Sequence, residues 1–233
     1  MKYLLALLAG IACGVIVFVL LVYYNPLARR PSLSPLAVSS SGQMELAFAA
    51  GSRELVAATG SGLTSATRYP ASIQELWEPA VEDTSLVVAL LRNSRGQPAG
   101  LGIKFATTAE QPGILNGVYP VSSAWHVWLV DRGGLMIDQT ENRWSLLREI
   151  ALPARVSSAD SWRGTYYGVL TDGPNALGTG RVAGGSGGLR GARGEAVEAV
   201  SVRAWSVADG PVAMEGRLTI ALDPAAETAA SAR

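Results

Sequence analysis

The chain has 233 residues, 48 % of them hydrophobic, and its 19 lysines and arginines balance 19 aspartates and glutamates. Proteins that bind nucleic acid concentrate positive charge on one face, so this balance, without a basic cluster, excludes nucleic acid as an expected partner. The single histidine, His126, excludes a metal site built from several histidines, and we predict neither a metal ion nor a cofactor.

The first segment, from Tyr3 to Tyr24, has no charged residue and no proline. A helix of this length, at about 1.5 Å per residue, crosses the hydrocarbon core of a bilayer, which is about 30 Å thick. A cleavable signal peptide has a shorter apolar region, of about 7 to 15 residues. A lipoprotein processing site at Cys13 is a second alternative, but the apolar run continues well past that residue. We therefore expect residues 1–26 to form an uncleaved transmembrane anchor whose partner is the lipid bilayer.

The charges beside this anchor bear on its orientation, because lysine and arginine are commoner on the cytoplasmic side of a span. Lys2 precedes the segment, whereas Arg29 and Arg30 follow it, so the two flanks are nearly balanced. The short N-terminal flank and the strand-rich remainder, which has no cysteine, favour an exported domain. We expect a single-pass protein of a bacterial-type inner membrane, with its domain in the periplasm.

The rest of the chain divides into three parts. Residues 27–42 are rich in proline and serine and have neither a helical nor a strand period, so we expect an extended linker. Residues 43–223 are numerous enough for one domain with its own core. The small and polar residues 224–233 are typical of a disordered tail.

Within the domain, short apolar runs alternate with glycine-containing turns, a pattern that predicts many β-strands. The predicted strands are residues 44–49, 54–58, 86–92, 101–106, 123–130, 135–138, 162–170, 178–183, 196–207 and 214–222. Ser72 and Glu75 fit a capping box and predict one short helix. Residues 144–156 fit either a strand or a helix, and Pro153 is predicted to end that segment.

The last predicted strand shows the clearest period of two, since Met214, Leu218 and Ile220 alternate with Glu215 and Arg217. This alternation is typical of a sheet with one buried face. A sheet of this many strands limits its exposed edges by closing into a barrel or by splitting into a sandwich. We predict an all-β fold, an antiparallel barrel preceded by one transmembrane helix.

Residues 178–195, GTGRVAGGSGGLRGARGE, contain a dense set of glycines. They do not match the phosphate-binding pattern GxxxxGK[ST]. Glycine is required where φ is positive or where backbones approach closely, so we predict a strand, a tight turn at residues 184–188 and a second strand from about Arg193.

This segment resembles the glycine hairpin of the allene oxide cyclase and dirigent barrel families. Residues 184–187 (GGSG) and 192–194 (ARG) carry the resemblance, with Ser186 in place of the usual threonine and Leu189 in place of a commoner aromatic residue. The resemblance covers about the last quarter of the chain. It implies a calycin-like barrel of about eight strands whose apolar cavity holds a hydrophobic small molecule, which some members cyclise or couple. The families' catalytic residues have no match in this motif.

Aromatic residues supply the candidate ligand site, because aromatic walls offer a large apolar contact area. We predict that Trp125, His126, Trp128 and Tyr166 line the cavity. Alternation places His126 and Trp128 on one face of their strand and Trp125 on the other. Core packing of the tryptophans and a structural role for His126 are the alternatives to ligand binding. Tyr166 and Tyr167 face opposite sides, so at most one of them points inward.

No catalytic residue is predicted, because the chain has no G-x-S-x-G motif and no second histidine. Asp131, Asp138 and Glu141 are expected on a solvated loop.

The preferred function is therefore an envelope protein whose membrane-anchored barrel binds a hydrophobic small molecule or a lipid. One alternative is a non-catalytic protein–protein interaction module, which an exposed apolar patch favours. The other is an enzyme of the cyclase or dirigent type, which requires ionisable groups that converge inside the barrel. A barrel interior filled by side chains counts against an internal ligand.

Overall fold

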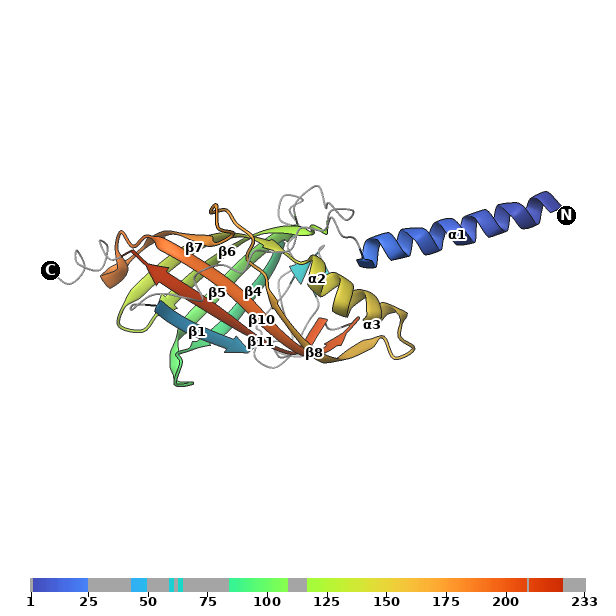
Figure 1. The fold of residues 1–233 in the computed structure, drawn as a ribbon. Coiled ribbons are helices and arrows are strands. Elements are labelled where there is room, and N and C mark those ends of the chain that lie inside the picture. Colours follow the sequence, from blue (N-terminus) through green and yellow to red (C-terminus); the bar gives the residue numbers. More distant parts are fainter. Residues whose placement is uncertain are drawn as a thin grey trace.

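The computed structural model describes residues 2–24, 43–49, 59–60, 63–64, 84–108, 117–208 and 210–223. These residues form an N-terminal helix and a mostly antiparallel β domain that closes into a barrel (Figure 1). The predicted fold class is confirmed. The predicted strand 54–58, the helix near Ser72 and the tail 224–233 lie outside the described residues.

Helix α1, Lys2–Tyr24, has 23 residues and is therefore about 35 Å long. Its segment Lys2–Leu21 has a mean hydropathy of 3.0, and none of it is buried against the rest of the protein. A helix that is apolar on every side is stable when lipid surrounds it. The chain thus has one N-terminal helix that is long and apolar enough to cross a membrane, as the sequence predicts.

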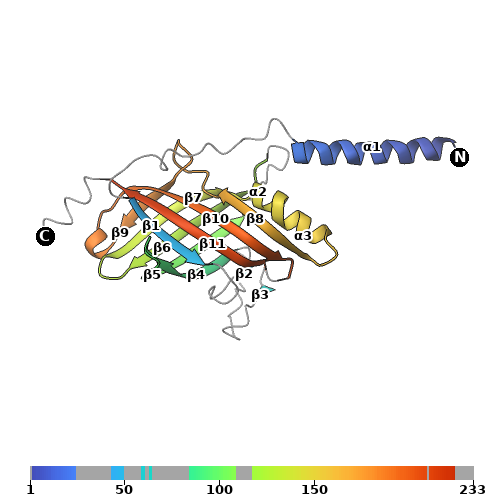
Figure 2. The same cartoon turned by 60° about the horizontal axis from the view of Figure 1, so that its bottom comes forward.

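Eight strands close the barrel, and every pairing between them is antiparallel. Around the ring they follow the order β11–β1–β4–β5–β6–β7–β9–β10, and β10 pairs again with β11 (Figure 2). Their bounds are β1 Gln43–Ala49, β4 Thr84–Arg92, β5 Pro98–Thr108, β6 Pro120–Leu129, β7 Gly133–Asn142, β9 Gly180–Gly185, β10 Gly194–Ser206 and β11 Gly210–Leu222. The short strands β2, Thr59–Gly60, and β3, Leu63–Thr64, form a separate pair.

Strand β10 is long enough to pair with two different strands on one side. Its first residues, from Gly194, pair with β9, and its later residues, from Ala199, pair with β8, Ser161–Val169. A bridge between Glu141 and Thr171 joins this region to β7. The sheet therefore extends beyond the ring at one end.

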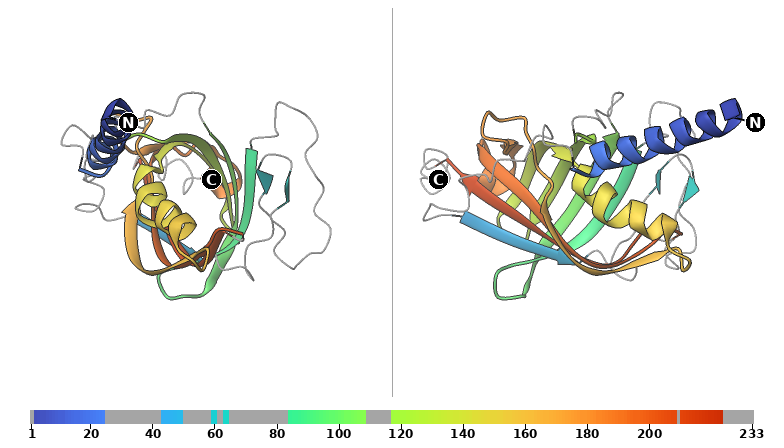
Figure 3. Two further views of the ribbon diagram at one scale, coloured as in Figure 1. Left: turned by 90° about the vertical axis from the view of Figure 1, so that its right-hand side faces the viewer. Right: turned by 45° about the vertical axis from the view of Figure 1, so that its right-hand side comes forward.

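A helical segment covers the extended part of the sheet (Figure 3). It consists of α2, Trp144–Leu146, the π-helical turn η3, Leu147–Ala151, and α3, Leu152–Val156. The prediction that Pro153 ends the segment is wrong. Pro153 lies in the first turn of α3, where its missing N–H is least costly, and the wide turn η3 precedes it. Ile150 packs against Tyr166 and Val202, which fixes the helical segment on the sheet.

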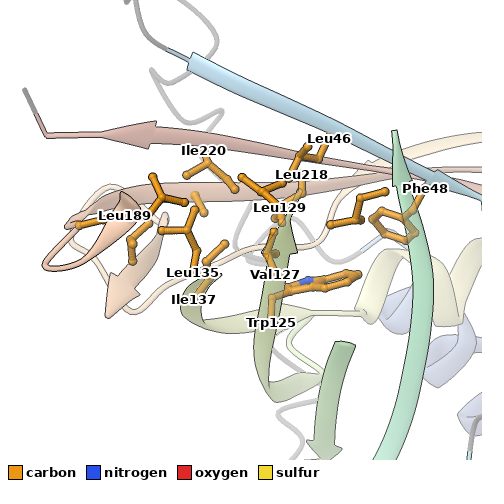
Figure 4. Packing of buried hydrophobic residues seen from close by; sticks show 14 of the residues in the cluster. Leu46, Phe48, Trp125, Val127, Leu129, Leu135, Ile137, Leu189, Leu218 and Ile220 are labelled. Carbon is orange, nitrogen blue, oxygen red and sulfur yellow. The ribbon is translucent and has the colours of Figure 1, made fainter. Parts of the chain in front are cut away.

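Apolar side chains from strands all around the ring fill the other part of the interior (Figure 4). Trp125 and Phe48 pack with their ring centroids 5.0 Å apart. A Cβ at Gly216 would lie 2.0 Å from the Phe48 ring, so only glycine leaves room for that ring. The alternation predicted for β11 is confirmed, because Leu218 and Ile220 are fully buried.

The glycine-rich segment forms the predicted strand, turn and strand. Between β9 and β10 lies a 3-10 turn, η4, Gly187–Leu189, which places the buried side chain of Leu189 in the end of the barrel. A Cβ at Gly133, whose φ is 108°, would lie 2.1 Å from the backbone oxygen of Ser186. Glycine is thus needed at this corner because two backbones approach closely.

Candidate functional site

Three charged side chains from three different strands meet inside the barrel. Lys104 lies on β5, Glu141 on β7 and Glu198 on β10, and each is at most 6 % exposed. Nζ of Lys104 is 2.7 Å from both carboxylate oxygens of Glu198 and 2.7 Å from Oε1 of Glu141. All three occupy inward positions of their strands, which explains why they converge.

Neutral polar side chains complete this ionic cluster. Trp125 donates its indole N–H to Oε2 of Glu198 at 2.9 Å. Gln139 donates to both glutamates and accepts a hydrogen bond from the hydroxyl of Thr171 at 3.0 Å. Among the described residues, no buried side-chain nitrogen or oxygen lacks a hydrogen-bond partner. Such a fully satisfied network makes the burial of charge tolerable.

Arg143 connects the ionic cluster to the surface, because its side chain is 31 % exposed and its Nε lies 2.7 Å from Oε2 of Glu141. Ser123 also donates to Glu141. Burial by itself raises the pKa of the Glu141 carboxyl, but the charges of Lys104 and Arg143 outweigh burial and hold that pKa well below its usual range. With Glu198, the cluster contains two cations and two carboxylates and is electrically balanced.

The chemistry available to the ionic cluster follows from this balance. A carboxylate that two cations hold in its ionised form is a weak base, and Glu141 is fully buried. The groups satisfy one another rather than pointing at an open space. Ionisable groups therefore converge inside the barrel, as a cyclase-type enzyme requires. Because they bond to one another, their arrangement supports the fold rather than a reaction.

The expectation that Glu141 lies on a solvated loop is wrong, because β7 continues to Asn142 and turns Glu141 into the core. Asp131 does lie in an exposed turn, with a φ of 61°. Asp138 lies on β7 itself and pairs with Arg181 at 3.4 Å on the outside of the barrel.

The outer surface of β4 to β7 presents a second feature, an apolar wall. An antiparallel strand with one buried face usually has polar residues on its other face. Here six of the outward side chains are large and apolar, and they are 36 to 68 % exposed. The apolar wall consists of Leu90, Leu101, Ile103, Phe105, Trp128 and Met136.

A groove with a volume of about 470 Å³ runs over this wall. Leu101 and Ile103 of β5, Trp128 of β6 and Met136 of β7 line it, and His126 and Ser186 are its polar side chains. The imidazole of His126 meets the Phe105 ring edge-on, with the ring centroids 5.9 Å apart. An elongated apolar group fits this lining better than a charged one.

The structure divides the four predicted ligand residues among three places. His126 and Trp128 lie together in the outer groove. Trp125 is fully buried within the ionic cluster. Tyr166 is buried against the helical segment, where its hydroxyl lies 2.7 Å from Oγ of Ser145, and Tyr167 faces outward. The predicted alternation of faces is confirmed, but the four residues do not surround one cavity.

Lys104, Gln139 and Glu198 were not predicted as site residues. Their signal in the sequence is positional: Lys104 falls between Gly102 and Ala106 on the inward face of its strand. The apolar wall has a signal too, because residues 124–130 are apolar at most positions of both faces. A run that is apolar on both faces predicts a strand covered on both sides.

No protein-family model matches the chain, and no curated protein matches it.

Proposed function

We propose that this membrane-anchored barrel binds a hydrophobic small molecule or the acyl chain of a lipid in the groove over the apolar wall. The observation that carries the proposal is the row of exposed, contiguous apolar side chains on β5, β6 and β7. Large contiguous apolar patches are uncommon on the surfaces of soluble monomeric proteins, and they mark binding sites. The packed interior counts against an internal ligand. The proposed site therefore lies on the outside of the barrel, whereas the sequence predicts it in the barrel cavity.

The lining suggests how such a ligand would lie. The exposed indole of Trp128 offers a broad flat surface, and Met136 is a flexible side chain that adapts to irregular shapes. The groove lies on the outer surface of the barrel, which lets a ligand enter from outside. A location in a bacterial-type inner membrane with the barrel in the periplasm, and membership of the cyclase and dirigent barrel families, remain part of this proposal.

Photochemical crosslinking tests the proposal on the full chain reconstituted in nanodiscs. A palmitic acid analogue with a diazirine near its methyl end is added, irradiated and mapped by peptide mass spectrometry. We expect labels on peptides that contain Trp128 or Met136. A carboxylate in the groove, Met136→Glu, should lower this labelling at least tenfold, because an unpaired charge is costly in an apolar site.

Tyr167→Glu is the matched control, since it places the same carboxylate at another exposed large side chain that lies outside the groove. It should leave labelling of the wall unchanged. Labels that are confined to α1, or that Met136→Glu does not reduce, would contradict the proposal.

A protein partner is a second candidate, because the same exposed wall satisfies the condition for an interaction module. A photoreactive amino acid at position 128 distinguishes the two in cells. A discrete protein adduct that Met136→Glu removes favours a protein partner, and its absence together with lipid labelling favours the lipid. The fully partnered ionic cluster does not favour the cyclase-type alternative.

A further inference from the structure

Three turns lie side by side at one end of the barrel, next to the most exposed part of the apolar wall. Asn93 begins the turn between β4 and β5, and Val130 of the next turn donates its N–H to Ala99 at 3.0 Å. Ser186, before η4, exchanges backbone hydrogen bonds with Gly134 at 2.8 and 3.3 Å. Figure 2 shows this turn end opposite the end that holds α2 and α3.

The turn end carries an excess of positive charge. Its charged residues are Arg92, Arg95, Asp131, Arg132, Arg190, Arg193 and Asp223. Five arginines against two aspartates give a net formal charge of +3, in a chain whose total is zero. Arg95, Arg132 and Arg190 are all exposed. Arginines beside exposed Trp128 and Val130 are the combination that suits the interface of an anionic bilayer.

The first strand of the barrel also begins at this end. Strand β1 begins at Gln43, which pairs with Ala221 near the end of β11. The 18 residues between Tyr24 and Gln43 span at most about 60 Å when fully extended. A barrel tethered by this length stays close to the membrane that holds α1.

We propose that the turn end is a docking surface for an anionic phospholipid bilayer, in which the arginines contact lipid headgroups and Trp128 and Val130 enter the interface. This inference goes beyond the proposed ligand groove. Docking would place the open groove beside the bilayer and so give it access to acyl chains.

The test measures how close the turn end lies to the bilayer in the full chain. In a Cys13→Ala background, Ser94→Cys carries an environment-sensitive NBD probe on the turn end. Ser158→Cys carries the same probe beyond α3, at the opposite end. Nanodiscs contain a spin-labelled lipid quencher in either pure phosphatidylcholine or a mixture with 40 % phosphatidylglycerol.

We expect quenching of the probe at position 94 with phosphatidylglycerol, its loss at 1 M salt, and little quenching of the probe at position 158. The triple change Arg95→Gln, Arg132→Gln and Arg190→Gln should lower the ratio of docked to undocked barrel roughly 100-fold, since each basic residue near an anionic surface contributes severalfold. The corresponding arginine-to-lysine triple should still dock, which separates charge from folding.

Equal quenching of both probes would overturn the proposal. Quenching at position 94 that is the same with and without phosphatidylglycerol would also overturn it. Self-association through this end, seen as a dimer by native mass spectrometry, would overturn it as well. Fatty-acid labelling of the groove needs no phosphatidylglycerol, so failure of the docking surface and failure of the ligand groove give different results.

Discussion

The two faces of strands β5, β6 and β7 both depart from the usual arrangement of a soluble barrel. Inside, Lys104 and Glu141 are buried charges; outside, Ile103, Phe105 and Trp128 are exposed apolar groups. On β5 the inversion occurs between neighbours, because Lys104 is 6 % exposed while Phe105 is 42 % exposed. Both faces depart from the expected pattern, but among the described residues only the inner face is fully partnered.

The inner face finds its partners within the protein. Lys104 forms ion pairs with both Glu141 and Glu198. The buried charges of the inner face are therefore part of the fold. The apolar wall is exposed among the described residues, and it differs from the outside of β1 and β11, where Glu45 and Arg217 form an ordinary surface pair at 2.8 Å. The difference indicates that the ionic cluster contributes to the stability of the fold, whereas the wall is the surface to which we assign the proposed ligand.

The largest expected effect comes from breaking the inner face. Lys104→Met leaves two buried carboxylates without their shared cation and should lower the free energy of unfolding by about 3–5 kcal/mol. Denaturant unfolding of the detergent-solubilised full chain, followed by tryptophan fluorescence, measures this loss. Arg181→Met is the matched control, because it removes a cation from an exposed pair and should cost less than about 1 kcal/mol.

The second variant restores the balance of charge in the interior. Adding Glu198→Gln to Lys104→Met removes one buried anion and keeps the Glu141–Arg143 pair. We expect the double variant to recover at least about 1 kcal/mol of the loss, since an unpaired buried charge is the main cost. A double variant with a lower free energy of unfolding than Lys104→Met would contradict the idea that the unpaired carboxylate of Glu198 causes the loss.

The third prediction concerns pH. The folded-state pKa of Glu141 is depressed from its usual value near 4.5, so its contribution to stability is complete above that pH and declines as the pH falls below it. Each proton taken up only by the unfolded chain costs about 1.4 kcal/mol per pH unit. Glu141→Gln should flatten the slope of unfolding free energy between about pH 4.5 and about pH 3 by about one proton. An unchanged slope would contradict the assignment.

The smallest effect on stability is expected on the outer face. Trp128→Ser should change the free energy of unfolding by no more than about 0.5 kcal/mol, because the side chain is 68 % exposed. It should nevertheless reduce fatty-acid labelling of the groove severalfold. Tyr167→Ser serves as the control for both measurements. A large loss of stability with unchanged labelling would make the wall a structural feature.

Local pattern was sufficient for much of the fold. The alternation of Leu218 and Ile220 with Arg217, the turns at Asn93 and Gly133, and the apolar segment before Tyr24 depend on neighbours in the chain, and the structure agrees with them. The prediction for Pro153 is wrong because proline ends a helix in its interior but is tolerated in its first turn. The local pattern does not show where that turn begins.

What the sequence by itself determined is therefore the apolar N-terminal helix, the strands and the alternation of their faces, since these follow from the local run and spacing of apolar residues. Only the tertiary structure decided which polar groups meet, because Lys104 and Glu198 are 94 residues apart and join when the ring closes. It also decided that Trp125 supports the core while Trp128 faces outward in a groove. The alternation of residues along a strand defines two faces. Only the closure of the barrel decides which of the two faces the core and which faces outward.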